Sequence, residues 1–345
     1  MSRDHAIALG ALILSAVITW LVLKLALRFQ LIDRPSSRSS HSLPTPRGGG
    51  VAIVLAFFAA LFTLQFADDE DLHLTNALIF GGAAVAIVGM IDDRWSLRPR
   101  NRLLVHLAAA AFAVWRIGMP ASWQLVAPMS WVVAVIGLIA ITWGANLFNF
   151  MDGIDGLAAL EAVFMAGGAV VINTVIHGDA GITAVWLALA ASSMGFLVWN
   201  WPPARIFMGD VGSGFLGFAL TACTLAMSRH QPANIPVVVI LGGVFFVDAS
   251  VTVIRRILRG DRWLEPHRLH AYQHLARRWQ SHRQVTVGVG LINVVWLLPC
   301  AFVAATHPSM AVTCAIVALL PLVLLAAAAG SGRPERPPDL KIGST

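Results

Sequence analysis

Long apolar runs alternate with short polar connections along the whole chain. Each run is close to the roughly 20 residues that cross a bilayer as a helix. So many apolar stretches cannot all be buried in one water-soluble core. The pattern therefore predicts an all-α, polytopic integral membrane protein with about 10–11 transmembrane helices. The expected spans are 6–27, 48–66, 75–91, 103–119, 129–147, 156–176, 181–199, 212–228, 235–257, 285–305 and 309–329.

Composition supports this class and excludes several others. The chain is 57% hydrophobic and 12% charged, whereas a soluble domain is about 25% charged. Cys223, Cys300 and Cys314 all lie within apolar runs, so they indicate helix packing rather than disulfides or a zinc site. No Gly-Lys-Ser/Thr sequence occurs, which excludes a Walker-type nucleotide site.

The basic residues predict an orientation. All but three of the 24 Lys and Arg residues fall in one set of alternating connections and the C-terminal tail. By the positive-inside rule this set is cytoplasmic, and an odd number of spans then places the N-terminus in the periplasm. The unusual polar residues gather in the same connections, which favours an enzyme with its site on the cytoplasmic face. A transporter would place them near the bilayer midplane.

Four of these connections carry carboxylates. Asp92 and Asp93 follow the third span, Asp152 and Asp155 the fifth and Asp210 the seventh, and Asp261 and Glu265 lie in the long connection after the ninth. Asn149, Asp152 and Asp155 are spaced three apart, so on a helical turn they share one face. Oxygen ligands without clustered His or Cys favour Mg²⁺, with Mn²⁺ as an alternative. The alternative reading is that each Asp caps a helix.

The long connection 255–284 supplies basic partners. His267, Arg268 and His270 are suited to contacting phosphate, whereas the arginines at 255–262 are equally well explained by anionic lipid headgroups. The first cytoplasmic connection, 33–50, is constrained by prolines and enters the second span through three glycines. Taken alone, those glycines are as consistent with helix packing as with anion binding.

At these motifs the chain resembles the polyprenyl-phosphate N-acetylhexosamine-1-phosphate transferases, glycosyltransferase family 4. The resemblance covers DxPxxRxxH…P..GG from Asp33 to Gly50 and the Asp92–Asp93 pair. It continues through NxxNxxDGxDG from Asn146 to Gly156 and FMGDxGS from Phe207 to Ser213. Several long motifs in the same order make this resemblance specific.

The resemblance implies a reaction. The phosphate of undecaprenyl phosphate attacks the β-phosphorus of a UDP-N-acetylhexosamine, which yields undecaprenyl-diphospho-sugar and UMP with Mg²⁺. It also implies the bacterial inner membrane, a bilayer-embedded catalytic domain over residues 1–330 and a disordered cytoplasmic tail over 331–345. No nucleic acid partner is expected, and a homodimer is left open.

The resemblance also assigns roles to individual residues. Metal contact is implied for Asp210 and Asp152. Catalytic roles near the metal and the acceptor phosphate are implied for Asp92, Asp93, Asp155 and His270, although the family leaves open whether one acts as a base or a nucleophile. Substrate binding is implied for Asn149, Asp152, Asn200, Arg205, Phe207, His267, Arg268 and His41.

One departure bears on the donor sugar. Relatives that act on muramoyl-pentapeptide carry a His-His-His run, and those that transfer GlcNAc-1-phosphate carry His-Ile-His-His, whereas residues 267–274 here read HRLHAYQH. This resembles the branch that initiates O-antigen and lipopolysaccharide synthesis with UDP-GlcNAc, UDP-FucNAc or UDP-QuiNAc.

Two other classes remain as alternatives. An ion-coupled transporter or flippase of polyprenyl-linked sugars would need charges within the membrane, and only Glu161 and Asp248 lie in expected spans. Each of these acids is either a functional group or a structural hydrogen-bond partner. A CDP-alcohol phosphotransferase would need an Arg soon after Asp155–Gly156, which is missing.

Overall fold

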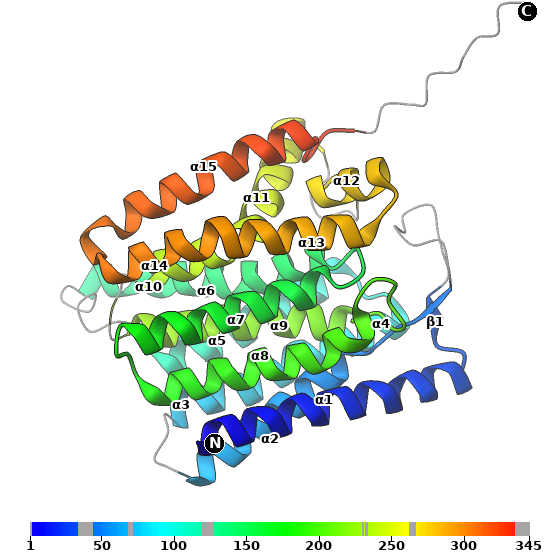
Figure 1. Cartoon of the computed structure of the whole chain (residues 1–345), viewed down its shortest axis with the longest axis horizontal. Coiled ribbons are helices and arrows are strands. Elements are labelled where there is room, and N and C mark those ends of the chain that lie inside the picture. The colour runs from blue at the N-terminus through cyan, green and yellow to red at the C-terminus, as the bar shows by residue number, and fades with distance from the viewer. Residues whose placement is uncertain are drawn as a thin grey trace, which may run out of the picture.

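The computed structural model describes residues 2–33, 44–67, 72–118, 127–229, 231, 234–261 and 267–334. Within these ranges nearly all regular structure is helical, and the predicted all-α membrane class is confirmed. The helices lie side by side, with α1 along one edge of the bundle and α15 along the other (Figure 1). The N-terminus and the end of α15 lie at opposite ends of the bundle.

The helical elements follow one another with short connections. They are α1 Arg3–Arg28, α2 Gly50–Ala67, α3 Leu72–Asn76, η1 Ala77–Gly81, α4 Gly82–Trp95, α5 Pro99–Ile117, α6 Ala127–Met151, α7 Leu157–Val175, α8 Ala180–Asn200, α9 Asp210–Ser228, α10 Asn234–Leu241, α11 Gly243–Leu258, α12 Ala271–Trp279, α13 His282–Ile292, η3 Asn293–Leu297, α14 Leu298–Thr306, η4 Pro308–Met310 and α15 Ala311–Ala329.

Helix α9 forms the centre of the bundle. It packs against α4, α6 and α2, and also contacts α5, α7, α8 and α10. Of its most apolar stretch, 89% is buried, compared with 22% for α1 at the edge. Glycines permit the close packing, since a Cβ on Gly217 would lie 2.0 Å from the carbonyl oxygen of Gly144 in α6. The first residue of the central helix, Asp210, is therefore held firmly in place.

The predicted spans agree with most of these helices. Among the described residues, eight helical stretches are long and apolar enough to cross a membrane, and α10 with α11 would add a ninth span, bent by 79°. The expected spans 48–66 and 103–119 are the helices α2 and α5. Helix α2 is apolar but shorter than the others, and α5 carries arginines near both ends.

A small β-ribbon is the one departure from the all-helical pattern in the described part of the chain. Strands β1 (Ile32–Asp33) and β2 (Thr45–Pro46) pair antiparallel just beyond the C-terminal end of α1. Arg47, which follows β2, forms a parallel bridge with Phe207. The ribbon thus ties the connection between α1 and α2 to the segment that leads into α9.

Candidate active site

A polar cavity of about 180 Å³ opens at the end of the bundle where α9 begins. Its walls come from the β-ribbon, the end of α6, the connections before α7 and α9, and the starts of α12 and α13. The lining residues are Asp33, Arg47, Asn149, Asp152, Gly153, Ile154, Asp155, Asn200, Phe207, Gly209, Asp210, Gln273 and His282.

Backbone hydrogen bonds fasten the β-ribbon to the segment before α9. The N–H of Phe207 donates to the Pro46 carbonyl at 2.8 Å, and the N–H of Gly49 donates to the Phe207 carbonyl at 2.9 Å. The N–H of Gly50 donates to Met208 O at 2.9 Å. A Cβ on Gly50 would lie 2.4 Å from the Cα of Gly212, so this close approach requires glycine. This pairing between residues 46–50 and 207–208 positions Arg47 at the cavity.

Asp93 anchors the first turn of α9. Its carboxylate accepts the backbone N–H of Asp210 at 2.9 Å and that of Val211 at 3.3 Å. These are two of the N–H groups at a helix start that lack an intrahelical partner, so Asp93 caps α9 from the neighbouring helix α4. Gly209 adopts φ +78°, and a Cβ there would lie 2.5 Å from Asp93 Oδ2.

Two arginines bridge the carboxylates. Arg47 lies 2.6 Å from Asp210 Oδ1 and 2.8 Å from Asp93 Oδ1. Arg102, in the first turns of α5, lies 2.5 Å from Asp92 Oδ2 and 2.8 Å from Asp210 Oδ2. Asp92 also accepts the backbone N–H of Leu97 at 2.5 Å. Both oxygens of Asp210 therefore have a cationic partner.

The surroundings of Asp152 in the cavity oppose its ionisation. Burial is the main cause that raises the pKa of its carboxyl well above the usual value, and Asp210, Asp93 and Asp155 add to the rise. The positive charge of Arg47 opposes it only in part. Burial would lower the pKa of Arg47, but the negative charges of Asp210, Asp93, Asp33 and Asp152 together outweigh it and raise that pKa. The cavity thus favours a cation or a protonated carboxyl at Asp152.

The donor chemistry of the cavity fits a hard divalent cation. Asp152, Asp155, Asp210 and Asn149 all line the cavity and offer oxygen atoms, the ligand type that Mg²⁺ and Mn²⁺ prefer. The described residues do not form a ready-made group of three acidic, His or Cys ligands. Asp152 and Asp210 would hold the ion, and substrate phosphates would complete its ligands.

Several predicted site residues meet in this cavity. Asn149 donates to Ser213 Oγ at 3.2 Å. Asn200 accepts the N–H of Gly156 at 3.0 Å and donates to Ile206 O at 2.9 Å, so it holds two connections together. The three residues of this set that line the cavity besides the acids are Asn149, Asn200 and Phe207.

Other predicted residues lie outside the cavity lining. Arg205 is exposed, with its guanidinium 5.5 Å from the Trp199 ring centroid. The backbone carbonyl of Arg268 accepts from Arg277 at 3.1 Å. Asp92 and Asp93 lie behind Asp210, to which they are linked through the two arginines. His41 lies outside the described residues.

His267 and His270 form an aromatic cluster beside the cavity. Their ring centroids are 5.0 Å apart, and both rings lie 6.3 Å from that of Phe150. Burial, then the neighbouring His270 and Arg256, lower the pKa of His267 to about 3, so its ring is neutral at physiological pH. His270 is only 1% exposed. The catalytic role expected for it stays a prediction.

The two acids within expected spans, Asp248 and Glu161, are hydrogen-bonded to neighbouring segments. Asp248 in α11 accepts the backbone N–H groups of Ala271 at 2.8 Å and Tyr272 at 3.2 Å, which caps α12. It also accepts from the buried Ser331 at 2.8 Å. Glu161 in α7 accepts from Asn293 at 2.6 Å.

The tail beyond residue 334 lies outside the described residues.

Five residues of the site have no role predicted from the sequence. Arg47 and Arg102 pair with the acids, and Asp33, Gln273 and His282 line the cavity. Arg47 directly precedes the three glycines at 48–50, and Asp33 begins the family motif that ends at those glycines. A role for both residues could therefore have been predicted from the sequence. His282 follows Ser281, whose hydroxyl accepts the N–H of Gln284 as a helix cap, but nothing in the local sequence links it to Asp155.

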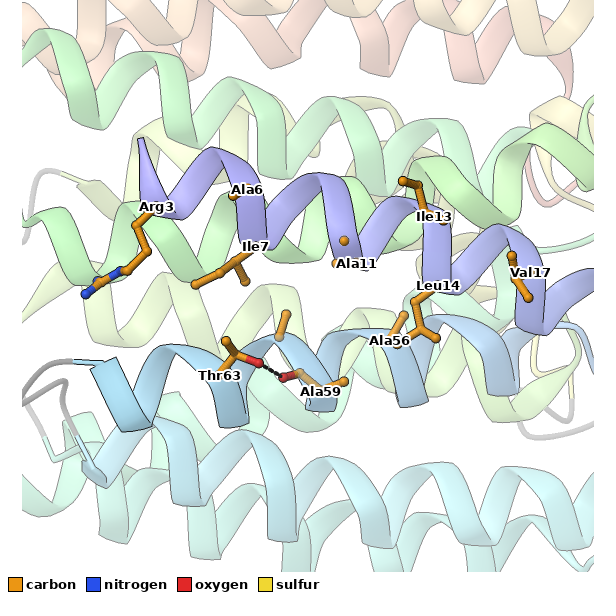
Figure 2. A pocket seen from close by; sticks show the side chains of 12 residues that line it. Arg3, Ala6, Ile7, Ala11, Ile13, Leu14, Val17, Ala56, Ala59 and Thr63 are labelled. Atoms are coloured by element: carbon orange, nitrogen blue, oxygen red, sulfur yellow. Dashed lines mark hydrogen bonds between the residues drawn. The ribbon is translucent and has the colours of Figure 1, made fainter. Parts of the chain in front are cut away.

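A larger groove lies elsewhere. It has a volume of about 700 Å³ and runs between α1 and α2, where Ile7, Leu14, Ala56 and neighbouring side chains face one another (Figure 2). Arg3 is its one charged lining residue. Apolar side chains exposed on α1, such as Ile13 at 53%, suit contact with lipid. The lining of this groove lacks the acids and amides of the polar cavity, so the groove is not the candidate active site.

Comparison with known proteins places this architecture in a family. The profile of glycosyl transferase family 4 matches residues 75–228, which contain Asp92, Asp93, Asp152, Asp155 and Asp210. A phospho-N-acetylmuramoyl-pentapeptide-transferase of a Synechococcus species is 30% identical over 269 residues, covering 71% of this chain and 70% of the relative. The chain belongs to glycosyl transferase family 4, as its motifs predicted.

Two further relatives are similar over most of their length. A probable undecaprenyl-phosphate N-acetylglucosaminyl 1-phosphate transferase of Bacillus subtilis is 28% identical over 288 residues, covering 81% of this chain and 79% of the relative. A decaprenyl-phosphate N-acetylglucosaminephosphotransferase of Mycobacterium leprae is 29% identical over 338 residues, covering 87% and 82%.

Proposed function

We propose that this protein transfers N-acetylhexosamine-1-phosphate from a UDP-sugar to undecaprenyl phosphate, with release of UMP. The observation that carries the proposal is the polar cavity at one end of the helical bundle. There Asp152 and Asp210 lie beside Arg47, together with Phe207 and Asn200. The names of the relatives support it, since they are transferases that use a polyprenyl phosphate or a phosphomuramoyl group.

Each part of the cavity suits a part of this reaction. The guanidinium of Arg47 can contact a phosphate, the aromatic face of Phe207 can stack on a uracil, and the carboxylates can hold Mg²⁺. A bound Mg²⁺ would offset negative charge on the two phosphorylated substrates. An oxygen of the acceptor phosphate would attack the β-phosphorus, and the bond to the oxygen that UMP retains would break.

A general base is of secondary value for this transfer. A phosphate monoester has a second pKa near 6, so the acceptor is largely ionised at pH 7. The task of the protein is alignment of the two phosphates and neutralisation of their charge. Asp93 contributes to this alignment because it caps α9 and so fixes the position of Asp210.

The location and end product belong to the same proposal. The basic connections predict that the cavity faces the cytoplasm of a bacterial inner membrane, where a cytosolic nucleotide sugar meets a lipid phosphate. The segment HRLHAYQH at 267–274 supports a donor of the UDP-GlcNAc, UDP-FucNAc or UDP-QuiNAc type and a role in initiating O-antigen or a related envelope polysaccharide.

A donor panel tests the proposal. Purified protein in detergent receives undecaprenyl phosphate, Mg²⁺ and, in turn, the three UDP-N-acetylhexosamines and UDP-MurNAc-pentapeptide. We expect UMP release with one N-acetylhexosamine donor, loss of release with EDTA, and recovery when Mg²⁺ or Mn²⁺ is restored. Release only with the muramoyl donor would contradict the predicted branch. A folded protein that releases UMP with none of them would contradict the proposed reaction.

A further inference from the structure

His282 brings an imidazole into the cavity from the last third of the chain. It is the first residue of α13, directly after the Ser281 cap. Its Nδ1 lies 3.1 Å from Asp155 Oδ1, and the two side chains are 17% and 13% exposed. Both residues line the polar cavity together with Phe207 and Asn200.

Two contacts to Asp155 hold the ring of His282. The backbone N–H of Asp155 donates to Nδ1 at 3.4 Å, and Nδ1 also lies 3.1 Å from Asp155 Oδ1. Asp155 therefore contacts Nδ1 through both its backbone and its carboxylate, and these contacts orient the imidazole in the cavity.

Asp155 is itself fixed from three sides. Its Oδ2 accepts the N–H of Ala204 at 3.0 Å, and its carbonyl accepts the hydroxyl of Thr286 at 2.8 Å. The next residue, Gly156, is hydrogen-bonded to Asn200. Both carboxylate oxygens of Asp155 thus have contacts, which hold it in position to orient the imidazole.

We propose that His282, oriented by Asp155, is a binding residue for the uridine nucleotide of the donor. The inference rests on the proposed function and adds a residue to its substrate site. The imidazole shares one small cavity with an aromatic ring, an amide and the cationic Arg47, a combination suited to a base, a ribose and a phosphate. Asp155 acts through His282 and is a positioning residue.

A purely structural role makes a different prediction. Thr286 lies one helical turn after His282, and its hydroxyl donates to the backbone carbonyl of Asp155, so it also anchors α13 to Asp155. Unlike His282, it is fully buried and does not line the cavity. If His282 only fastened α13, Thr286→Val would have the same consequences as His282→Ala. Arg283 is exposed in the same turn and provides a second control for loss of a polar side chain.

The experiment measures UMP binding to the full-length protein by equilibrium titration, and steady-state kinetics with the accepted donor. We expect His282→Ala to weaken UMP binding and raise the donor KM by about 10-fold, the value of one lost hydrogen bond. The kcat and the KM for undecaprenyl phosphate should change less than about threefold. Asp155→Asn should act in the same direction, and the double variant should be no worse than His282→Ala.

The outcomes separate this inference from the proposed function. Wild-type UMP affinity in His282→Ala, or equal losses in Thr286→Val or Arg283→Ala, would overturn the role of His282 while leaving the reaction intact. A folded wild-type protein that neither binds UMP nor releases it from any donor would overturn the proposed function and this inference with it. Thermal unfolding of each variant identifies losses caused by misfolding.

Discussion

A single methyl group at Gly89 should displace the carboxylate at the centre of the site. Gly89 lies in α4 on the same face as Asp93, four residues away, and directly against the start of α9. A Cβ at Gly89 would lie 2.5 Å from the carbonyl oxygen of Asp210, 2.6 Å from its carbonyl carbon and 2.7 Å from Val211 N. These are backbone atoms, which cannot rotate away as a flexible side chain can.

The structure sets the size of the effect. Ordinary contacts begin near 3.4 Å, so Gly89→Ala lacks about 0.9 Å of separation. The start of α9 must move by that amount, which stretches the hydrogen bonds from Asp210 and Val211 to Asp93. Overpacking of this kind costs about 1–3 kcal/mol of stability. A displacement of about 1 Å at a catalytic group can cost on the order of 100-fold in rate.

The assay compares Gly89→Ala with Gly167→Ala. Gly167 lies inside α7, and a Cβ there meets nothing within 4 Å, so its variant tests the general effect of a helical Gly→Ala change. We expect kcat for UMP release to fall about 100-fold in Gly89→Ala and to stay within twofold in Gly167→Ala. Wild-type turnover in Gly89→Ala, with the protein intact in detergent, would refute the claim that this close approach positions Asp210.

Three further predictions concern charge and stability. Asp152→Asn should raise the melting temperature of the ion-free protein more at pH 8 than at pH 5. The raised pKa of Asp152 makes its ionisation in the folded state unfavourable, and this cost grows as the pH rises from the unfolded-state pKa of about 4 toward the folded-state pKa; an equal shift at both pH values would contradict it. His267→Gln should leave the shape of the pH–rate profile between pH 5 and 8 unchanged, since a pKa of about 3 keeps His267 neutral throughout; a profile that moves would show that His267 titrates there. Ser331→Ala should lower the free energy of unfolding by about 1 kcal/mol through loss of the hydrogen bond to Asp248, measured by chemical denaturation in detergent; an unchanged value would show that this contact does not stabilise the fold.

The sequence predicted the membrane class and the location of the site because both depend on local patterns. Apolar runs of fixed length identify most spans, and motif acids in alternating connections must meet at one end of a helical bundle. Asp152, Asp155 and Asp210 do line one cavity. The family resemblance, rather than this reasoning, named Asn200 and Phe207, which line the same cavity.

The remaining features depend on pairings between distant segments. Arg47 reaches Asp210 because residues 45–50 pair with residues 207–208, a register that no local pattern reports. The role of Asp93 as a cap depends on how closely α4 approaches α9. His282 meets Asp155 only through the packing of α13 beside α7. The 79° bend between α10 and α11 was likewise absent from the predicted single span at 235–257.

The central claim is that a sugar phosphate, rather than a sugar, moves to the lipid. The most direct measurement uses the accepted UDP-sugar labelled with ³²P at its β-phosphorus, together with undecaprenyl phosphate, Mg²⁺ and the purified protein. We expect the label to enter the lipid fraction while unlabelled UMP is released, and Asp210→Asn to abolish both. Label that stays in the aqueous phase as UDP while sugar appears on the lipid would contradict it.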